Sequence, residues 1–429
     1  MVSVRRPDHH HPFVDPELLV LSAYAPLFRV PGALPFIAGT TLSRTGGAMF
    51  GVAVIVMLSE RRGSFGLAGA VSAVGLAVLA VAGPVIGRLV DKHGQRRVAL
   101  PFVLVSAACG FTVVVLSWRD APAWTLFLFY GLSAVLPEPG PMSRARWAHI
   151  FRHEPQRLHT AMSFEQVADE ASFVVGPVLA VLVSTLWFPE AGLLLAEILF
   201  TAGMLTFLAA RATEPPVVPH ADRPTGLAVR RPGLLLVATA LVMTGVIFGA
   251  NEVIAVAYAK EAGQTGFASV ILGAFALGST LAGIVFGSRV FRSTMTRRLV
   301  IAATGMFVLE VPALLVDGLW PLAVVMFVAG SATAPLLITS LSLAQRLVPK
   351  ALVTEGMAVA VTGILIGISA GSAVGGWAVE AWGAQLAYAV PVVSGGLALA
   401  LIALRYRHLE GAELAGGRAL EQDSTPVTA

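Results

Sequence analysis

The feature that most constrains the fold of this chain is a series of long apolar runs with almost no charged residues. Many of these runs exceed about eighteen residues, the length that crosses a bilayer core as an α-helix. The chain has 429 residues, of which 56% are hydrophobic and only 13% are charged, whereas soluble domains carry about 25% charged residues. Because the chain has too few polar residues to cover a surface that faces water, the sequence predicts an all-α membrane protein.

The apolar runs predict twelve spanning helices. They are expected at 31–58, 65–87, 98–118, 123–145, 158–186, 190–211, 233–258, 266–288, 299–316, 320–343, 353–377 and 385–405. The segment "RATEPPVVPHADRPTGLAVRRPG" between the sixth and seventh helices is rich in Pro and Arg and lacks an apolar period, which is typical of a linker. The expected parts are a cytoplasmic N-terminal tail (1–30), an N-terminal six-helix bundle (31–211), a cytoplasmic linker (212–232), a pseudo-symmetric C-terminal six-helix bundle (233–405) and a cytoplasmic C-terminal tail (406–429).

The basic residues predict the orientation. If the N-terminus is placed in the cytoplasm, 24 of the 29 Lys and Arg fall on the cytoplasmic side and 4 outside, while Arg44 lies within the first helix. Cytoplasmic loops of membrane proteins carry this excess of Lys and Arg. We therefore expect a multi-pass protein of the cell (inner or plasma) membrane with both termini in the cytoplasm.

The loop "GRLVDKHGQRRV", residues 87–98, interrupts the apolar pattern with a basic turn. Gly87 would allow close approach of a neighbouring helix, Gly94 would supply the tight turn, and Asp91 could cap a helix or pair with an arginine. The combined spacing is more specific, because it resembles the signature loop of the major facilitator superfamily. The residues that carry the resemblance are Gly87, Asp91, Lys92, Gly94, Arg96 and Arg97, with Gln95 where a basic residue is usual.

The resemblance implies a secondary transporter that works by alternating access. It also implies that the loop is a conformational latch, in which Asp91 meets the start of the eleventh helix near 353–356 and closes the cytoplasmic side. Two marks of drug–proton antiporters are incomplete here. Phe127 stands where exporters often carry an arginine, and the Gly-Pro…Gly-Gly pattern of the fifth helix is reduced to Gly176-Pro177. The resemblance therefore implies the fold more directly than it implies antiport.

Several ionisable residues lie inside the predicted membrane spans, where each charge costs at least a few kcal/mol, and four of them are the candidates for a charge pair or a proton-coupling site. They are Arg44 in the first helix and Glu165, Asp169 and Glu170 in the fifth. Glu165 and Asp169 share one helix face, and Glu170 points about 100° away. Two interpretations remain open: a brace of Arg44 with Asp169 or Glu170, or a proton-coupling site.

Candidates for the substrate cavity are mainly aromatic or acidic side chains on helices expected to line it. They are Phe127, Tyr130, Glu138, Phe248, Asn251 and Glu252. Small residues are expected instead to pack helices closely. These are Gly176 with Pro177 in the fifth helix and Gly367 with Gly371 in the eleventh.

The sequence contains no phosphate-binding G-x-x-x-x-G-K-[ST] motif and no His/Cys pattern typical of a metalloenzyme. We therefore expect no enzyme activity, cofactor, metal or nucleic-acid partner. Three function classes remain: proton-coupled efflux of a small, largely apolar compound, which the apolar cavity candidates favour; proton-coupled uptake of a small nutrient by a symporter; and a non-transporting membrane receptor or lipid-handling protein. The expected partners are a small-molecule substrate, protons as the coupling ion and the lipid bilayer, with a monomeric protein.

Overall fold

The structure is a computed structural model that describes residues 24–217, 232–287, 289, 291–348 and 353–422. These residues form helices and connecting turns without a β-strand. The N-terminal half contains α2 (Ala33–Arg62), α3 (Phe65–His93), α4 (Gln95–Trp118), α5 (Ala123–Ser133), α6 (Pro139–Ile150), α7 (Pro155–Leu186), α8 (Ala191–Ala209) and the 3-10 turn η1 (Arg211–Thr213). The C-terminal half contains α9 (Pro232–Glu261), η3 (Thr265–Phe267), α10 (Ala268–Gly287), α11 (Met295–Glu310), η4 (Val311–Leu314), α12 (Leu319–Gly330), α13 (Thr333–Arg346), α14 (Val353–Trp382), α15 (Ala384–Ala387), α16 (Ala389–Leu404) and α17 (Tyr406–Gln422).

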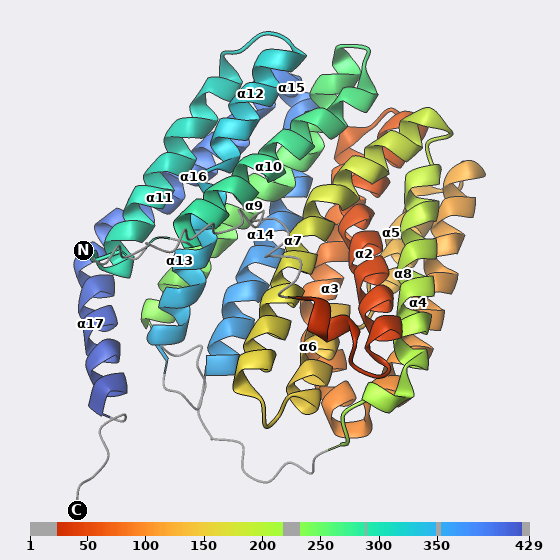
Figure 1. Cartoon of the computed structure of the whole chain (residues 1–429). Helices are drawn as coiled ribbons and strands as arrows, with labels where there is room; N and C mark the ends of the chain where they lie inside the picture. The colour runs from red at the N-terminus through yellow and green to blue at the C-terminus, as the bar shows by residue number, and fades with distance from the viewer. Residues whose placement is uncertain (1–23, 218–231, 288, 290, 349–352, 423–429) are drawn as a thin grey trace, which may run out of the picture.

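The twelve predicted spans correspond to twelve helical segments of the described chain. Ten segments are long and apolar enough to cross a membrane by themselves. The other two are the α5–α6 pair, whose α5 part is a short apolar helix, and α11, which has 16 residues. The all-α, twelve-helix fold class is confirmed, and Figure 1 shows the two groups of helices side by side.

Several predicted spans and tails differ from single helices or plain tails. The tenth span is divided into α12 and α13, and the twelfth into α15 and α16. The fourth span is broken between α5 and α6, where Pro139 takes the first helical position of α6, a position that tolerates the missing N–H of proline. Residues 24–28 are helical within the expected N-terminal tail. The region expected as a C-terminal tail forms α17, whose Glu413 accepts hydrogen bonds from the Met295 and Thr296 backbone N–H groups at 2.7 and 2.9 Å. This carboxylate caps the N-terminus of α11, where the helix dipole favours a negative charge.

Close helix crossings depend on glycine where the two backbones nearly touch. A Cβ at Gly367 of α14 would lie 2.8 Å from the Cα of Gly245 on α9, and a Cβ at Gly371 would lie 2.7 Å from the Cα of Val246. A Cβ at Gly176 of α7, next to Pro177, would lie 2.7 Å from that of Ala48 on α2. Gly87 differs, because a Cβ there would meet no atom of the described residues within 4 Å. The close approach expected at Gly87 is therefore not made by the described part of the chain.

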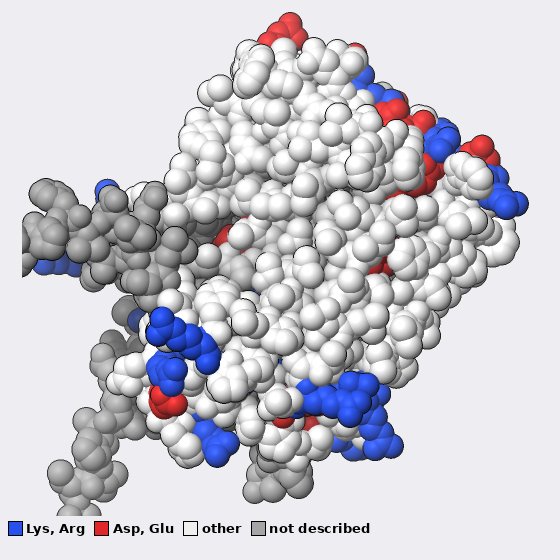
Figure 2. Space-filling model, turned by 45° about the vertical axis from the view of Figure 1, so that its right-hand side comes forward, with Lys and Arg blue, Asp and Glu red and all other residues white. Residues whose placement is uncertain are grey.

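The buried apolar core divides along the length of the molecule. One cluster joins both halves and includes Met49 and residues 52–58 of α2 and 253–259 of α9. At the other end the core separates into one cluster within the C-terminal half and another within the N-terminal half. We call the end with the shared cluster the sealed end and the opposite one the divided end. In Figure 2 a broad band of uncharged side chains separates charged residues that gather toward the two ends of the visible face.

Candidate functional site

An ion network joins three helices inside the N-terminal half. Arg44 of α2, whose side chain is 5% exposed, bonds to Glu165 of α7 through its Nη2 atom. The Nε atom of Arg44 lies 2.9 Å from Oδ1 of Asp169, one turn further along α7. The other oxygen of Asp169 accepts a hydrogen bond of 2.5 Å from Arg144 of α6. Two arginines and two carboxylates therefore balance one another in charge.

The α6 helix provides the remaining donors around Glu165. The hydroxyl of Ser143 donates to Oε1 of Glu165 at 2.7 Å, and the indole N–H of Trp147 donates to the same atom at 2.8 Å. With Arg44 on the other oxygen, the fully buried carboxylate has a donor for each of its atoms. A buried carboxylate is stable only when it is paired and hydrogen-bonded in this way. Glu165 thereby fixes α6 against α7 despite the break in the fourth span.

The sequence placed these residues inside the first and fifth spans but did not choose among the carboxylates. Asp169 contacts Arg44, as one of the two brace pairs proposed, and Glu165 contacts it as well. Glu170 does not join the network: it is exposed and accepts a hydrogen bond of 3.0 Å from the side chain of Gln166. Glu138, at the break before α6, is exposed and interacts electrostatically with Asp169 and Arg144. The side chains of Asp169 and Arg144 are 22% and 35% exposed, which makes this the accessible edge of the network.

Sequence reasoning missed a second buried arginine. Arg146 of α6 is completely buried, and its guanidinium lies 3.7 Å from the ring centre of Phe207 on α8. Its Nε donates to the Gln95 side chain at 2.8 Å, and its Nη1 donates to Ala210 O at 2.8 Å and to the Thr213 hydroxyl at 2.9 Å. The available signal was the polar stretch "RARW", residues 144–147, in an otherwise apolar span. Gln95, which replaces a basic residue in the signature loop, has its amide N–H bonded to Met142 O at 2.9 Å.

The signature loop lies at the divided end. Gly94 has φ +94° and ψ 150°, a conformation that only glycine adopts easily. The backbone N–H of Arg96 donates to Glu214 at 2.9 Å, which fixes the start of α4 to the segment after α8. Asp91, Lys92 and Arg97 are exposed. Asp91 forms no hydrogen bond or ion pair with the described part of the chain. The side chains of 353–355 lie outside that part, so the latch stays a prediction.

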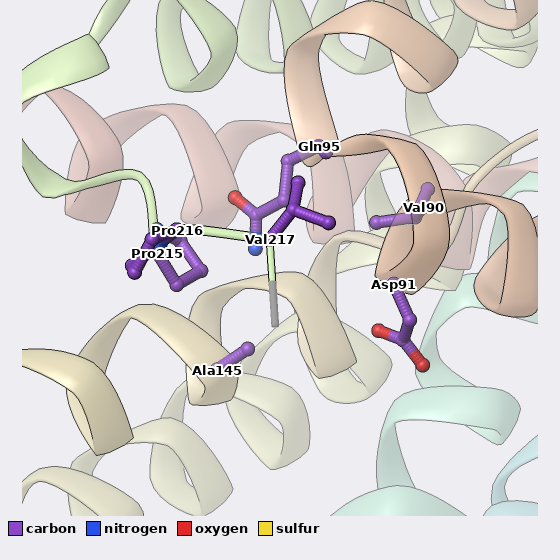
Figure 3. A pocket seen from close by; sticks show the side chains of 8 residues that line it. Val90, Asp91, Gln95, Ala145, Pro215, Pro216 and Val217 are labelled. Carbon is purple, nitrogen blue, oxygen red and sulfur yellow. The ribbon is translucent and has the colours of Figure 1, made fainter. Parts of the chain in front are cut away.

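A pocket of about 220 Å³ lies beside this loop. Figure 3 shows its lining, with the Asp91 carboxylate at the edge and pointing away from Gln95. The lining residues are Val90, Asp91, Gly94, Gln95, Ala145, Pro215, Pro216 and Val217. None of the sequence-predicted cavity residues lines it, so this pocket belongs to the loop and not to the predicted substrate site.

The cavity candidates lie in different surroundings. Tyr130 is buried and donates a hydrogen bond of 3.3 Å to Phe50 O, while Phe127 packs against the shared core. Phe248 makes an edge-to-face contact with Phe275, with ring centres 5.9 Å apart. Asn251 faces the interior of the C-terminal half and bonds to Glu310.

Glu252 is the candidate that reaches between the halves. Its Oε2 lies 3.3 Å from the position that a Cβ at Gly51 of α2 would take. Nearby, the buried hydroxyl of Ser72 on α3 has no hydrogen-bond partner among the described residues. Glu252 forms no ion pair with the described residues. It is therefore an acidic group at the contact between the two halves, without a neutralising neighbour in the described chain.

Hydrogen bonds across the two halves gather toward the sealed end. Within the described residues, Glu380 of α14 accepts from the Ser64 hydroxyl at 2.5 Å and from the Gly66 backbone N–H at 2.9 Å. Lys260 lies 3.2 Å from Glu60. The remaining inter-half bonds join Lys260 to Ser59 O, Thr265 to Glu60 and Ser369 to Ala73 O. The structure is thus closed at this end, in agreement with the shared core.

Two groups of apolar helices that contact each other at one end define a polytopic α-helical membrane protein. The sequence profile of the Major Facilitator Superfamily matches residues 36–309. The chain belongs to this superfamily, and the resemblance of the signature loop is confirmed at the level of the family.

The chain is also similar to a curated protein and to several solved structures. Macrolide efflux protein A of Streptococcus pyogenes is 26% identical over 163 residues, which cover 35% of this chain and 37% of the relative. A bacterial homologue of the iron transporter ferroportin, in an inward-facing state, has a TM-score of 0.67 at 16% identity and covers 88% of this chain and 99% of its own. The nucleoside transporter NupG has a TM-score of 0.65 at 14% identity and covers 87% and 99%. At these identities the solved structures show a shared fold alone.

Proposed function

We propose that this protein is a proton-coupled exporter of a small, largely apolar compound in the cell membrane. The observation that carries the proposal is the accessible carboxylate of Asp169, bonded to both Arg44 and Arg144 at the edge of a buried ion network. A proton on Asp169 would remove its charge and weaken both ion pairs at once. Because α2, α6 and α7 meet there, proton binding would loosen the contacts among three helices.

Three observations favour export of an apolar compound. The relative that matches part of the chain is a macrolide efflux protein. The cavity candidates Phe127, Tyr130 and Phe248 are aromatic, which suits an apolar substrate. Glu252 at the contact between the halves would attract a substrate that carries a positive charge on an apolar body, as a weakly basic compound does.

The orientation of the chain in the membrane decides which conformational state of the transport cycle the structure represents. If the N-terminus lies in the cytoplasm, the sealed end faces outward and the divided end, with Asp91, faces inward. The structure would then be the inward-facing state of an alternating-access cycle, before Asp91 forms its latch. A reporter fused after Val217 should lie in the cytoplasm and one fused after Asp120 outside, and the opposite result would refute this orientation. We also propose that the protein is a monomer, because the two six-helix halves of the same chain pack against each other.

The function is tested by transport in cells and in proteoliposomes. Cells with and without the protein are compared for accumulation of macrolides and other apolar weak bases, with and without an ionophore that collapses the proton gradient. The expected result is lower accumulation that depends on the gradient. Asp169→Asn should abolish uphill transport and retain downhill exchange, because the amide mimics the protonated acid.

The matched control is Glu170→Gln, since Glu170 is on the same helix but exposed and outside the network. It should leave transport unchanged. Normal uphill transport by well-folded Asp169→Asn would overturn the proton role of Asp169. Gradient-driven accumulation of a compound inside cells would instead favour uptake.

A further inference from the structure

A second buried acidic group lies inside the C-terminal half, apart from the Arg44 network. Glu310, the last residue of α11, is 1% exposed, and Asn251 of α9 beside it is 2% exposed. Tyr388, between α15 and α16, is completely buried and interacts electrostatically with Glu310. Glu310 forms no ion pair with any described Lys or Arg. Its carboxyl group therefore lies in an apolar interior without a compensating charge.

Some buried polar atoms around Glu310 have no hydrogen-bond partner in the described chain. The amide N–H of Asn251 donates to Oε1 of Glu310 at 3.0 Å. The Tyr388 hydroxyl is buried without a hydrogen-bond partner in the described chain, and so are two acceptors, Oε2 of Glu310 and the amide oxygen Oδ1 of Asn251. Both atoms are acceptors if Glu310 is ionised, so neither can satisfy the other. Each unsatisfied buried group is costly, and an isolated buried charge is costlier still.

We propose that Glu310 binds a proton and forms a cyclic acid–amide pair with Asn251. In this pair the Asn251 amide donates to Oε1, as observed, and the proton on Oε2 is donated to Oδ1. One proton thus neutralises the carboxyl group and supplies the donor that both unpartnered atoms lack. The site would take a proton and no larger ligand.

The neighbouring elements offer no other neutralising group in the described chain. The α9 helix contributes Asn251 and Tyr258, and the Tyr258 hydroxyl is already bonded to Gly318 N at 3.0 Å and Val316 O at 3.5 Å. The cation of α9, Lys260, is paired with Glu60 at 3.2 Å. The α15–α16 junction contributes Tyr388, and α12 and α16 carry no ionisable residue. The ionisable residues of α13 and α17 lie away from Glu310: Arg346 is at the C-terminal end of α13, and Glu413 contacts the opposite end of α11.

The site would give the carrier one proton-binding group in each half, and this role in transport rests on the proposed proton coupling. Proton binding itself does not depend on it. A cyclic pair that joins α9 to α11 would also hold the seventh and ninth spans together. Loss of the proton would leave a charge between them and favour their separation.

Infrared spectroscopy of the purified protein tests the proposal directly. The wild-type protein should show the carbonyl stretch of a protonated carboxylic acid that shifts in D₂O. Glu310→Gln should lose that component, and it should fold because the amide can still pair with Asn251. Asn251→Leu should retain the component but shift it, since its hydrogen bond is lost. Glu170→Gln is the matched control and should leave the spectrum unchanged.

Two results would overturn the proposal. One is a spectrum of folded Glu310→Gln with the same protonated-acid signal as the wild type. The other is a Glu310-dependent signal that appears only when sodium is removed, which would assign the site to a metal cation. If Asp169→Asn transports normally while the Glu310 signal is present, the proposed function fails and the proton site stands.

Discussion

The two carboxylates that bond to Arg44 differ in burial, and this predicts different costs for removing their charges. Glu165 is fully buried and accepts hydrogen bonds from Ser143, Trp147 and Arg44. Glu165→Gln retains an oxygen for the two neutral donors but turns an N–H₂ group toward the guanidinium. The network is left with a net positive charge in the protein interior. Breaking a buried ion pair from one side costs about 3–5 kcal/mol.

Asp169→Asn should cost much less. The Asp169 side chain is 22% exposed, and its second partner Arg144 is 35% exposed, so water can solvate the arginine that loses its partner. Arg44 keeps Glu165. Exposed ion pairs contribute about 0–1 kcal/mol to stability. Because Asp169 is partly buried, removing its charge should cost about 1–2 kcal/mol, which is more than for an exposed pair and less than for a buried pair.

Thermal unfolding in detergent, followed by tryptophan fluorescence, compares the two variants with the wild type. Glu165→Gln should lower the midpoint clearly more than Asp169→Asn does. The double variant Arg44→Gln with Glu165→Gln should recover much of the loss, because it restores neutrality and leaves the Arg144–Asp169 pair intact. Equal midpoints for the two single variants, or no recovery in the double variant, would refute the reasoning from burial.

Three further predictions concern the loop, the sealed end and the second arginine. Gly94→Ala should destabilise the protein by about 1–3 kcal/mol because of its backbone conformation, while Gly87→Ala, whose added Cβ meets open space, should leave the unfolding midpoint unchanged. Glu380→Ala removes two hydrogen bonds across the halves, so pairs of spin labels at the sealed end should report longer distances, and unchanged distances would show that apolar contacts alone hold this end shut. Arg146→Met should lower stability by about 1–3 kcal/mol, since it leaves the buried Gln95 oxygen without a donor; a midpoint at or above that of the wild type would mean that packing replaces the lost bonds.

The sequence by itself determined the number of spans and the division of the chain into halves. Bilayer thickness sets a minimum length and hydropathy for every crossing, so each span is visible in the local sequence. The break before α6 was equally local, because proline removes a backbone donor wherever it stands. The turn at Gly94 is also a local feature, because the residue type at this one position decides whether the backbone can adopt the turn.

Only the tertiary structure decided which side chains meet. The shared face of Glu165 and Asp169 follows from helical spacing, but their common contact with Arg44 depends on how α2 crosses α7 and on where the broken α6 packs. The same holds for Asn251 and Glu310, which are 59 residues apart and lie on different helices. At Gly87 the residue type suggested a close neighbour, and no described residue lies there. Helix periodicity fixes the direction of a side chain about its own axis, whereas contacts depend on the relative position of two axes, which long-range packing alone sets.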